Sequence, residues 1–520
     1  MKLGMEQLQT LIDALSAQPE GASYRCVQEP YAQFLQAISP TEAELAAQRT
    51  QPPVPAPRFT LRLLGAWGQQ AWARTLTSLS AQSYPYFDIT LRADAPQGDY
   101  ILHLWPGDVL SPDALYRFAK AAGEGADLIY CDEDIQGPDE AQDRVEPFFK
   151  SAASRLTQLS FDMLSCGVAV GRELYRRAGA MAGAEAEDRY TYNLRCLAAC
   201  SRALHLPRPL YTLARDRRLG MPSGLEPPLA KGETAAAGQW RGSLRVECQP
   251  KKQPSVAIII PNLDGLPALR RLLESIEAKT LHFYSRILIA DLGSKDAQTH
   301  RYYGLLEKHR AARILYGPQP LSKLLNRAAL EAGAEVLVFV GRDAEILAPN
   351  WLESLLGQLY RPGVGAAGGK LVDGLGRLRF CGGAAGPDGL VHRLYEGSAD
   401  TLAGLRQNRF ANSIRAVSFL SLSCMALRAS VFWQAGGFHE GLERFGLDAA
   451  LCLRLRELGL SLAYTPYALL RCHAPLPSLA EAPAWDARRC REAVLAALPQ
   501  GDPHLSPHYE PAEGPPICRA

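Results

Sequence analysis

A short apolar run, Val336 to Val340, constrains the fold more than any other feature, because it ends abruptly at Gly341, Arg342 and Asp343. The run alternates too little for a half-exposed strand, so it predicts a central strand buried on both faces, as in a parallel sheet. In an open α/β sheet, ligands bind in the crevice outside the carboxyl ends of the strands. The sequence therefore predicts a binding site where this run meets its polar residues.

Further strand-like and helical patterns surround this run in β-α-β order. The segment Ser255–Gly265 is apolar and β-branched until Pro261, and a second apolar run ends at Asp291. Helical patterns lie at residues 266–276 and 321–332. This alternation predicts an α/β domain with a mostly parallel sheet.

The first half of the chain repeats the layout of the second half. Residues 98–121 match residues 334–357 in the order of strand, break, proline and helix. Two strand patterns precede the first of these segments, one from Phe59 and one that ends near Asp94. We therefore interpret Phe59 to about Leu213 as a first copy of the same fold.

Several ordered segments between about Pro254 and Pro475 resemble the nucleotide-sugar-dependent glycosyltransferases of family two, which have the GT-A fold. The segments VAIIIPNLDG and ADLGSKD resemble the nucleotide loop and the stretch whose leading Asp, here Asp291, holds the base. LSKLLNRAALEAGAE resembles the helix before the DxD-type metal motif, and VGRDAEILAPNWLE occupies the place of that motif. The segment from Cys424 to His473 resembles the acceptor side.

The resemblance and the repeat together imply an α/β fold of two GT-A-like domains in tandem, each Rossmann-like with a mostly parallel sheet, after an N-terminal helical segment. We expect the following parts: a helical segment and Pro-rich linker over 1–57, with a helix at Met1–Gln18 and extended chain at Pro40–Pro57; a degenerate glycosyltransferase-like domain over 58–221; a linker over 222–253; and a GT-A domain with a C-terminal helix and tail over 254–520.

The implied reaction is transfer of a sugar from a nucleoside diphosphate sugar, UDP- or dTDP-linked, to a hydroxyl of a glycan, lipid-linked or protein acceptor, with inversion. The enzyme would be of the hexosyltransferase type and act in surface polysaccharide synthesis or protein glycosylation. Such transfer needs charge stabilisation at the leaving diphosphate, usually by a divalent cation (Mn or Mg), and a carboxylate that takes the acceptor proton.

The resemblance places the roles on named residues. The donor would contact Pro261, Asn262, Asp264, Asp291, Arg342 and Asp343; the metal would bind Asp343 and His473; and Asp448 would be the catalytic base. Each has a plainer alternative: Asp343 as a surface acid, His473 as a structural residue, and Asp448 as a helix cap.

The second copy departs from the family pattern at three positions. Gly341 and Arg342 stand where the metal motif is usually acidic or amidic, and Ala450 replaces a second acid after Asp448. Arg342 could supply positive charge to the diphosphate itself, since a guanidinium matches phosphate oxygens, or it could mark a lost metal site. The alternative function is therefore a weakened pseudo-glycosyltransferase that acts as a scaffold or binding partner.

The first copy lacks most of the acidic and histidine residues that the resemblance implies for the site. Trp105, Pro106 and Gly107 occupy the place of its metal motif and leave only Asp108, and Leu210 to Thr212 replace the late histidine. A diphosphate-metal site needs anionic oxygen ligands, so we expect this copy to bind no nucleotide. The run Asp132–Asp134 is interpreted as a solvated edge, and Gly382–Gly389 of the second copy as a mobile loop.

Composition sets outer limits on the function. The net charge of +2 over 520 residues argues against an electrostatic nucleic-acid surface. The 12 cysteines lack zinc-site spacings and are expected to be reduced. No apolar run approaches the roughly 20 residues of a transmembrane helix, so we expect a cytoplasmic protein with at most peripheral contact at the inner face of the membrane.

Overall fold

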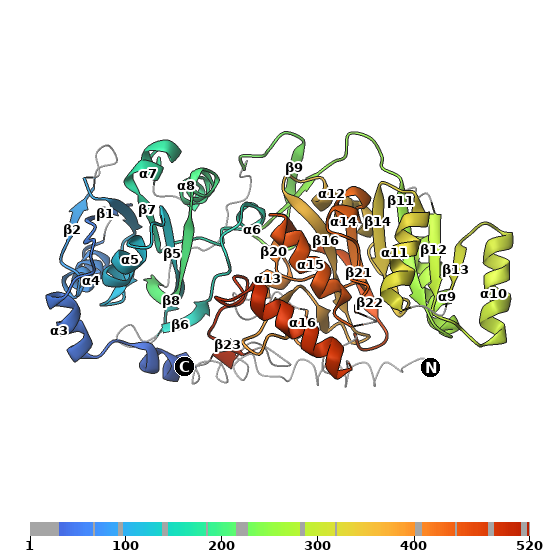
Figure 1. The fold of residues 1–520 in the computed structure, drawn as a ribbon. Helices are drawn as coiled ribbons and strands as arrows, with labels where there is room; N and C mark the ends of the chain where they lie inside the picture. Colours follow the sequence, from blue (N-terminus) through green and yellow to red (C-terminus); the bar gives the residue numbers. More distant parts are fainter. Residues whose placement is uncertain are drawn as a thin grey trace, which may run out of the picture.

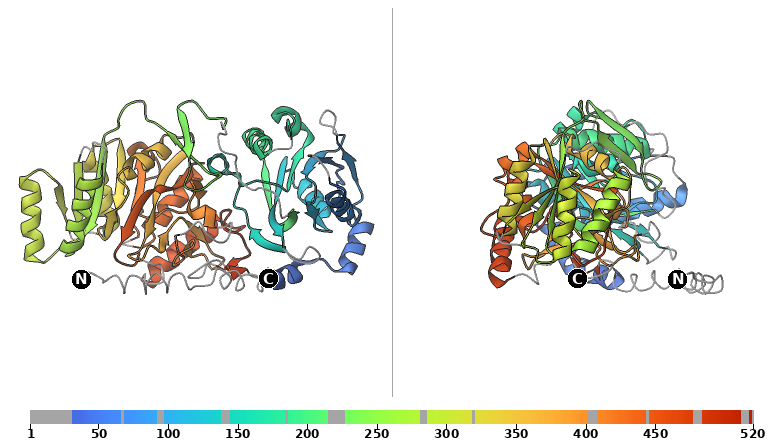
Figure 2. Two further views of the ribbon diagram at one scale, coloured as in Figure 1. Left: turned by 180° about the vertical axis from the view of Figure 1, so that it is seen from behind. Right: turned by 90° about the vertical axis from the view of Figure 1, so that its right-hand side faces the viewer.

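The computed structural model describes residues 31–65, 68–91, 97–137, 144–183, 186–214, 227–280, 286–317, 320–400, 408–442, 445–476, 483–510 and 517–518. It shows two α/β lobes side by side, the first half of the chain in one and the second half in the other (Figure 1). The view from behind shows the same two lobes (Figure 2). The predicted α/β class with two sheets is confirmed, and each sheet combines parallel and antiparallel pairs. The helix expected over Met1–Gln18 lies outside the described residues.

The larger sheet belongs to the second lobe. Its strands are β11 (Val256–Asn262), β12 (Arg286–Asp291), β13 (Arg313–Tyr316), β14 (Val336–Val340), β15 (Ala344–Ile346), β16 (Val364–Val372), β17 (Leu378–Phe380), β20 (Arg415–Val417), β21 (Cys424–Arg428) and β22 (Ser461–Cys472). The order is β13-β12-β11-β14-β21-β16-β22-β15, with β17 paired to β16 and β20 to β22. Strands β13, β12, β11 and β14 run parallel.

Helices cover both faces of this sheet. They are α9 (Leu266–Lys279), α10 (Ala297–Lys308), α11 (Leu321–Ala332), α12 (Trp351–Leu359), α13 (Asn408–Ala411), α14 (Ala429–Gln434), α15 (Leu447–Glu457) and α16 (Ala484–Ala497). All five residues of β14 are buried, as predicted. Leu337 and Phe339 belong to the apolar cluster that includes α11 and α15. Val338 belongs to the opposite cluster, which includes α9 and α12. Because successive side chains alternate between faces, both faces of β14 must be apolar.

The first lobe has the smaller sheet. Its strands are β1 (Phe59–Leu63), β2 (Phe87–Thr90), β3 (Tyr100–Leu104), β4 (Val109–Leu110), β5 (Leu128–Gln136), β6 (Arg144–Phe148), β7 (Val168–Gly171) and β8 (Ala203–Leu213). Its helices are α3 (Glu42–Thr50), α4 (Gln69–Ser80), α5 (Ala114–Ala122), α6 (Arg155–Ser160), α7 (Arg172–Ala178) and α8 (Ala186–Ala199). The strand order is β2-β1-β3-β7-β5-β8-β4, and β6 pairs with β5.

The two sheets have the same topology. Read from β12, the second sheet runs β12-β11-β14-β21-β16-β22-β15, and each neighbour corresponds in order to a strand of the first sheet. The directions agree as well: β3 and β7 pair antiparallel as do β14 and β21, and β5 and β8 pair parallel as do β16 and β22. The second lobe adds α10, β13 and α11 between β12 and β14. The strand order thus supports the repeat inferred from the sequence.

Two segments that the sequence suggested to be irregular are ordered. Within Pro40–Pro57, residues 42–50 form α3, because Thr41 and Glu44 make a capping box, while the prolines cluster after its end. The expected mobile loop Gly382–Gly389 contains β18 (Gly383–Ala385), which pairs with β19 (Val391–Arg393) in a hairpin. The expectation was wrong for residues 42–50 and for this loop, because the glycine and proline content of both stretches drew attention away from short regular elements.

The acidic run Asp132–Asp134 is not a solvated edge. The three residues lie within β5 and are fully buried. The Asp132 carboxylate lies 2.7 Å from the His205 ring. Glu133 forms an ion pair with Lys150 at 3.1 Å, and Asp134 one with Arg144 at 2.6 Å. Each charge therefore has a partner, which is the condition for burying carboxylates.

The segment between the lobes forms a hairpin rather than an open linker. Its strands are β9 (Glu233–Ala237) and β10 (Leu244–Cys248). Glu233 is buried and binds Arg155 of α6 at 2.8 Å and Arg361, beyond α12, at 3.0 Å. Burial alone would raise the pKa of Glu233, but the hydrogen bonds from Arg155 and Ala230 and the charge of Arg361 outweigh it and hold the pKa at about 2. One carboxylate thus joins arginines of both lobes.

We predict that Glu233→Gln lowers the free energy of unfolding by about 3 to 5 kcal/mol at neutral pH, the cost of removing one partner from a buried ion pair. The folded pKa lies below the unfolded value, so the stabilisation is present above about pH 4.5 and is lost as the pH falls towards 2. Chemical denaturation of both proteins at pH 7 and pH 3 measures this. A difference that does not shrink on acidification would contradict the ion-pair account.

Candidate functional site

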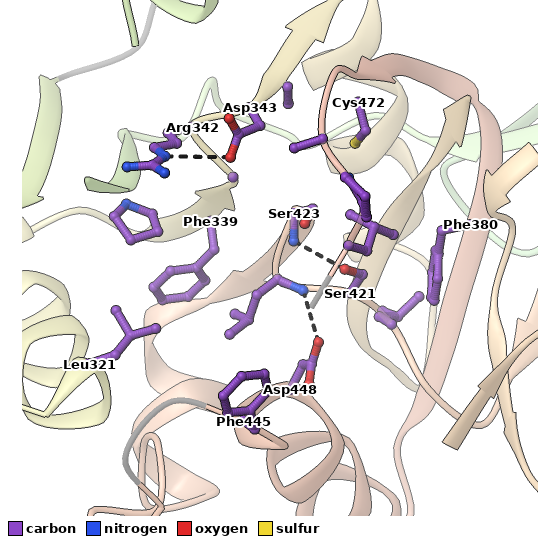
Figure 3. A pocket seen from close by; sticks show the side chains of 18 of the residues that line it. Leu321, Phe339, Arg342, Asp343, Phe380, Ser421, Ser423, Phe445, Asp448 and Cys472 are labelled. Atoms are coloured by element: carbon purple, nitrogen blue, oxygen red, sulfur yellow. Dashed lines mark hydrogen bonds and ion pairs between the residues drawn. The ribbon is translucent and has the colours of Figure 1, made fainter. Parts of the chain in front are cut away.

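A pocket of about 360 Å³ lies in the second lobe at the carboxyl ends of β11 and β14. Figure 3 shows Arg342 and Asp343 on one side of it and Asp448 on the opposite side. The loop before β21, which contains Ser421 and Ser423, forms the wall between them. The sequence predicted this position from the way the run of β14 ends.

Arg342 lies across the loop that follows β11. Its guanidinium donates to the carbonyl of Leu263, and its Nε lies 3.4 Å from an oxygen of Asp343. A Cβ on Gly265 would come within 2.7 to 2.8 Å of the guanidinium, so only glycine leaves room for this arrangement. Both charged side chains keep about a third of their surface exposed, 32% for Arg342 and 40% for Asp343. Arg342 therefore links the end of β14 to the loop after β11 by a hydrogen bond and also lines the pocket.

Gly341 packs against the loop that contains Ser423. A Cβ at this position would lie 3.2 Å from the Ser423 hydroxyl and 3.4 Å from the Ser423 Cα. The Gly341 N–H donates to the Ser423 carbonyl at 3.2 Å. A side chain here would need the neighbouring loop to move. The absence of an acid at Gly341 is thus linked to the packing of this wall.

Asp448 lies in the first turn of α15, and Gly446, in the left-handed conformation with φ 72°, is the N-cap. The Asp448 carboxylate accepts the N–H of Leu422 at 3.3 Å and that of Ala449 at 3.0 Å. Burial raises the pKa of Asp448, and these N–H groups offset part of that effect. The side chain lines the pocket, so its position suits a general base as well as a helix-start acceptor.

Asn262 and Asp291 belong to one hydrogen-bonded chain. The Asn262 amide donates to the Tyr303 hydroxyl at 2.6 Å, which donates to Asp291 at 2.8 Å. Asp291 also accepts the N–H groups of Gly293 and Ser294, is 1% exposed, and does not line the pocket. The Asn262 Oδ1, in contrast, accepts no hydrogen bond from any described residue, and Asn262 lines the pocket. Asn262 is therefore the member of this chain that lines the pocket, although its Oδ1 is itself buried.

Asp264 and Pro261 shape the same loop. Asp264 adopts a positive φ of 47°, and its carboxylate accepts the N–H groups of Lys295 and Asp296 at 2.7 and 2.8 Å. These bonds join the loops after β11 and β12, but Asp264 does not line the pocket, whereas Pro261 does. The donor contacts expected for Asp264 and Asp291 stay predictions.

His473 is not among the residues that line the pocket. Its ring lies 2.7 Å from the Glu345 carboxylate, which also binds Arg471 at 3.2 Å. The hydrogen bond with His473, followed by the charge of Arg471, lowers the pKa of Glu345. The His473 backbone N–H donates to the Asp343 carbonyl at 3.0 Å. The contact between the two residues is therefore a backbone hydrogen bond and does not involve their side chains.

The donor set around Asp343 does not fit a preformed cation site. Among the residues that the structure describes, no three His, Cys, Asp or Glu side chains come together as metal ligands. Among the described residues, Asp343 pairs with Arg342, a cation of the protein itself. The expected metal roles of Asp343 and His473 therefore have no support from this geometry.

Sequence reasoning missed most of the pocket wall. Charged groups come from the β18–β19 hairpin and its continuation, and aromatic groups come from several elements; these are Arg393, Glu396, Phe339, Phe380, Phe419 and Phe445. Arg393 binds Glu396 at 2.9 Å. Phe339, in the run that ends before Gly341, and Phe445, close before Asp448, had local signals. The others come from segments that lie far from these motifs in the chain.

The first lobe has a counterpart of this site that is closed. Val109 pairs with Thr212 in the first lobe as Ala344 pairs with Cys472 in the second, so Asp108 corresponds to Asp343. Asp108 is fully buried, and its carboxylate accepts the Tyr211 hydroxyl and, at 3.0 Å, the N–H of Ala214. By this register Leu213, and not Leu210 to Thr212, takes the place of His473.

No family model matches the chain. Over 414 residues it is 30% identical to the uncharacterised protein y4gI of Sinorhizobium fredii, which covers 72% of this chain and 44% of that protein. Over 446 residues it is 30% identical to the O-antigen biosynthesis protein RfbC of Myxococcus xanthus, 80% of this chain and 34% of that protein. The chain thus spans less than half the length of both relatives.

A third relative matches a smaller part of this chain. It is the N-acetylglucosaminyl-diphospho-decaprenol L-rhamnosyltransferase of Mycobacterium tuberculosis, 29% identical over 235 residues, which are 40% of this chain and 72% of that protein. Of these relatives, RfbC is named for O-antigen biosynthesis and the mycobacterial protein for rhamnosyl transfer.

Two solved structures have weaker likeness to the chain. GalNAc-T7 with UDP, GalNAc and Mn²⁺ has a TM-score of 0.39 at 15% identity and covers 48% of this chain and 49% of its own. The mannosyltransferase PcManGT of Pyrobaculum calidifontis, with GDP-Man and Mn²⁺, has a TM-score of 0.31 at 16% identity over 48% of this chain and 76% of its own. The fold assignment therefore rests on the strand order of the chain itself.

The raised pKa of Asp448 predicts a stability difference that depends on pH. At low pH the Asp448 carboxylate is neutral in both the folded and the unfolded protein, so it has no effect on stability. Because the pKa is higher in the folded protein, ionisation of Asp448 destabilises the fold as the pH rises, and the full penalty is reached above the folded pKa. Asp448→Asn carries no charge but has a single acceptor oxygen, so it can accept only one of the two N–H groups. We expect the stability of the wild type relative to the variant to fall between pH 3 and pH 7, by thermal unfolding. A stability difference that stays constant over this range would overturn this assignment.

Proposed function

We propose that this chain is a glycosyltransferase of the hexosyltransferase type that uses a nucleoside diphosphate sugar, UDP- or dTDP-linked, in polysaccharide synthesis. One observation carries the proposal: a single pocket has Arg342 and Asp343 on one wall and Asp448, a carboxylate with a raised pKa, on the other. This is the pair of charges that sugar transfer from a diphosphate requires. The names of two relatives agree with it.

The proposed reaction is a single displacement. The acceptor hydroxyl, on a glycan, lipid-linked or protein acceptor, attacks the anomeric carbon while the bond to the diphosphate oxygen breaks on the opposite face. The hydroxyl proton passes to an oxygen of Asp448, and the bond electrons leave with the diphosphate. Attack opposite the leaving group inverts the anomeric centre, and the raised pKa of Asp448 makes it the stronger base.

The nucleotide would occupy the side of the pocket formed by the first loop. Pro261 and Asn262 line it there. Arg342, at the end of β14, would face the diphosphate. Its guanidinium provides charge-assisted hydrogen bonds to phosphate oxygens.

We propose that Arg342 takes over part of the role that a divalent cation has in similar reactions. This follows from the poor fit of the residues around Asp343 to a cation. A bound Mn or Mg ion would stabilise the same diphosphate charge. Asp343 is the carboxylate at this wall that would contact it, and it would also hold the guanidinium in place.

Calorimetry with UDP and dTDP tests the donor side of the site. We expect binding of one nucleotide per chain, because Asp108 of the first lobe is closed in by Tyr211 and Ala214. Binding should persist in a chelator, weakened but not abolished. Arg342→Ala should cost about 1.5 to 3 kcal/mol of affinity, the scale of hydrogen bonds to a charged group. Arg327→Ala, on the exposed face of α11, is the control. Unchanged affinity in Arg342→Ala, or a second site per chain, would contradict the proposal.

Turnover of Asp448→Asn tests the base. We expect a loss of about 10²- to 10⁴-fold in kcat, the range of general-base catalysis, with nearly unchanged nucleotide affinity. Asparagine keeps one acceptor oxygen, for the N–H of either Leu422 or Ala449, and is itself a favoured helix-cap residue, so a purely capping role would leave most of the turnover. The measurement is initial rate with a donor that the wild type turns over. Near wild-type turnover would end the assignment.

A scaffold without activity is the second candidate. It is favoured by Gly341 and Ala450 at positions where the similar family carries acids, and by the lack of a metal-ligand cluster in the described part of the chain. The two candidates separate on one result. A scaffold would bind no nucleotide at Arg342 and would transfer no sugar from any donor, with or without manganese.

A further inference from the structure

The segment Ile414–Ser423 runs from the junction of the two lobes to the pocket. We call it the connecting segment. Its first part contains β20, which pairs antiparallel with β22 on one side. On the other side the N–H groups of Ile414 and Ala416 are hydrogen-bonded to the first lobe. Figure 1 shows α6 of the first lobe beside β20.

Two hydroxyl groups of α6 make these bonds. The Ser160 Oγ accepts the N–H of Ile414 at 3.1 Å, and the Thr157 Oγ1 accepts the N–H of Ala416 at 3.1 Å. All four residues are buried, with exposures between 0% and 4%. Water therefore cannot replace a lost hydroxyl without a local rearrangement, and an unpaired buried N–H is costly.

The rest of the connecting segment is held at nearly every second residue. The Ser418 hydroxyl donates to Asp502 at 2.5 Å, and Phe419 exchanges backbone bonds with Gly383 at 3.0 and 3.1 Å. The Leu420 N–H points at the Cys452 sulfur at 3.3 Å. The Leu422 N–H then donates to Asp448 at 3.3 Å. The chain of contacts that begins on α6 thus ends at the carboxylate.

The end of the connecting segment is also the wall of the pocket, since all residues from Phe419 to Ser423 line it. Aromatic packing fixes the start. Phe410, just before the segment, lies 5.4 Å from both Phe148 and Phe161 of the first lobe, measured between ring centroids. The first lobe therefore contacts the segment that shapes the site, although its own counterpart of the site is closed.

We propose that Thr157 and Ser160 of the first lobe are positioning residues for the site of the second lobe. They fix the backbone of the connecting segment, and through Leu422 the segment fixes the carboxylate of Asp448 and the pocket wall beside it. The inference rests on the proposed function for its effect on turnover. Its structural part, the support of the segment by α6, does not depend on that function.

Thr157→Val is the sharpest test, because valine keeps the shape of threonine and removes the acceptor. Thr157→Ser restores the acceptor and should restore the behaviour. Arg155→Met is the matched control: Arg155 lies on the same helix and at the same junction, but it binds Glu233 and not the connecting segment. Ser160→Ala is a second, milder variant should Thr157→Val fold poorly.

Hydrogen exchange by mass spectrometry and steady-state kinetics are measured on the full-length variants. In Thr157→Val we expect exchange of the amides at 418–423 to accelerate about three- to tenfold, and kcat to fall by a similar factor with an unchanged KM for the donor. Thr157→Ser should match the wild type in both measurements. Arg155→Met should lose thermal stability but keep kcat and the exchange rates of the segment.

Each outcome decides the inference. Equal kcat for Thr157→Val and the wild type, or an equal loss of kcat in Arg155→Met, would overturn the positioning role. Unchanged exchange at 418–423 in both Thr157→Val and Ser160→Ala would overturn the support by α6. If the wild type transfers no sugar from any donor, the proposed function fails, and the exchange rates alone decide whether the first lobe holds the wall.

Discussion

The burial of β14 on both faces is the constraint on which the second lobe depends. Side chains on a strand alternate between faces, so a strand covered by helices on both sides favours apolar residues until it ends, unless a buried charge finds a partner. Leu337 and Phe339 face one apolar cluster and Val338 the other. The polar side chains that β14 brings to the pocket therefore follow Val340, and they are those of Arg342 and Asp343. The same constraint applies to β11, whose polar loop meets Arg342 through the Leu263 carbonyl.

The sequence predicted the elements whose signals are local. β14, α11 and the β-α-β order follow from periodicity alone, and the resemblance placed Arg342, Asp343 and Asp448, which the structure brings to one pocket. It could not predict the pocket wall, because Arg393 and Phe380 arrive through pairings between strands far apart in the chain. It also misjudged Asp132–Asp134, since the partners that permit burial, such as Lys150 and Arg144, lie elsewhere in the sequence.

The two lobes show how one topology can keep or lose a site. The strand order is shared, yet Asp108 turns inward to Tyr211 while Asp343 remains at the pocket. The second lobe also inserts α10, β13 and α11, and Leu321 and Leu325 of α11 form part of the pocket lining. In its described residues the first lobe has neither the inserted helix nor an exposed acid at the position of Asp343. A fold is therefore weak evidence for function, and the site must be argued from its own residues.

A lobe with a closed site can still contribute to the chemistry of its neighbour. The first lobe presents buried hydroxyls to an edge strand whose other side is paired, which satisfies N–H groups that would otherwise require water at a dry junction. Glu233 adds a charge shared by Arg155 and Arg361, so movement of one lobe against the other would expose or separate buried ions. Both contacts favour one fixed arrangement of the lobes over a hinge. For the proposed base the hydroxyl contacts to the connecting segment matter most, because a carboxylate that has to lie within hydrogen-bonding reach of an acceptor hydroxyl loses most of its effect after a small displacement.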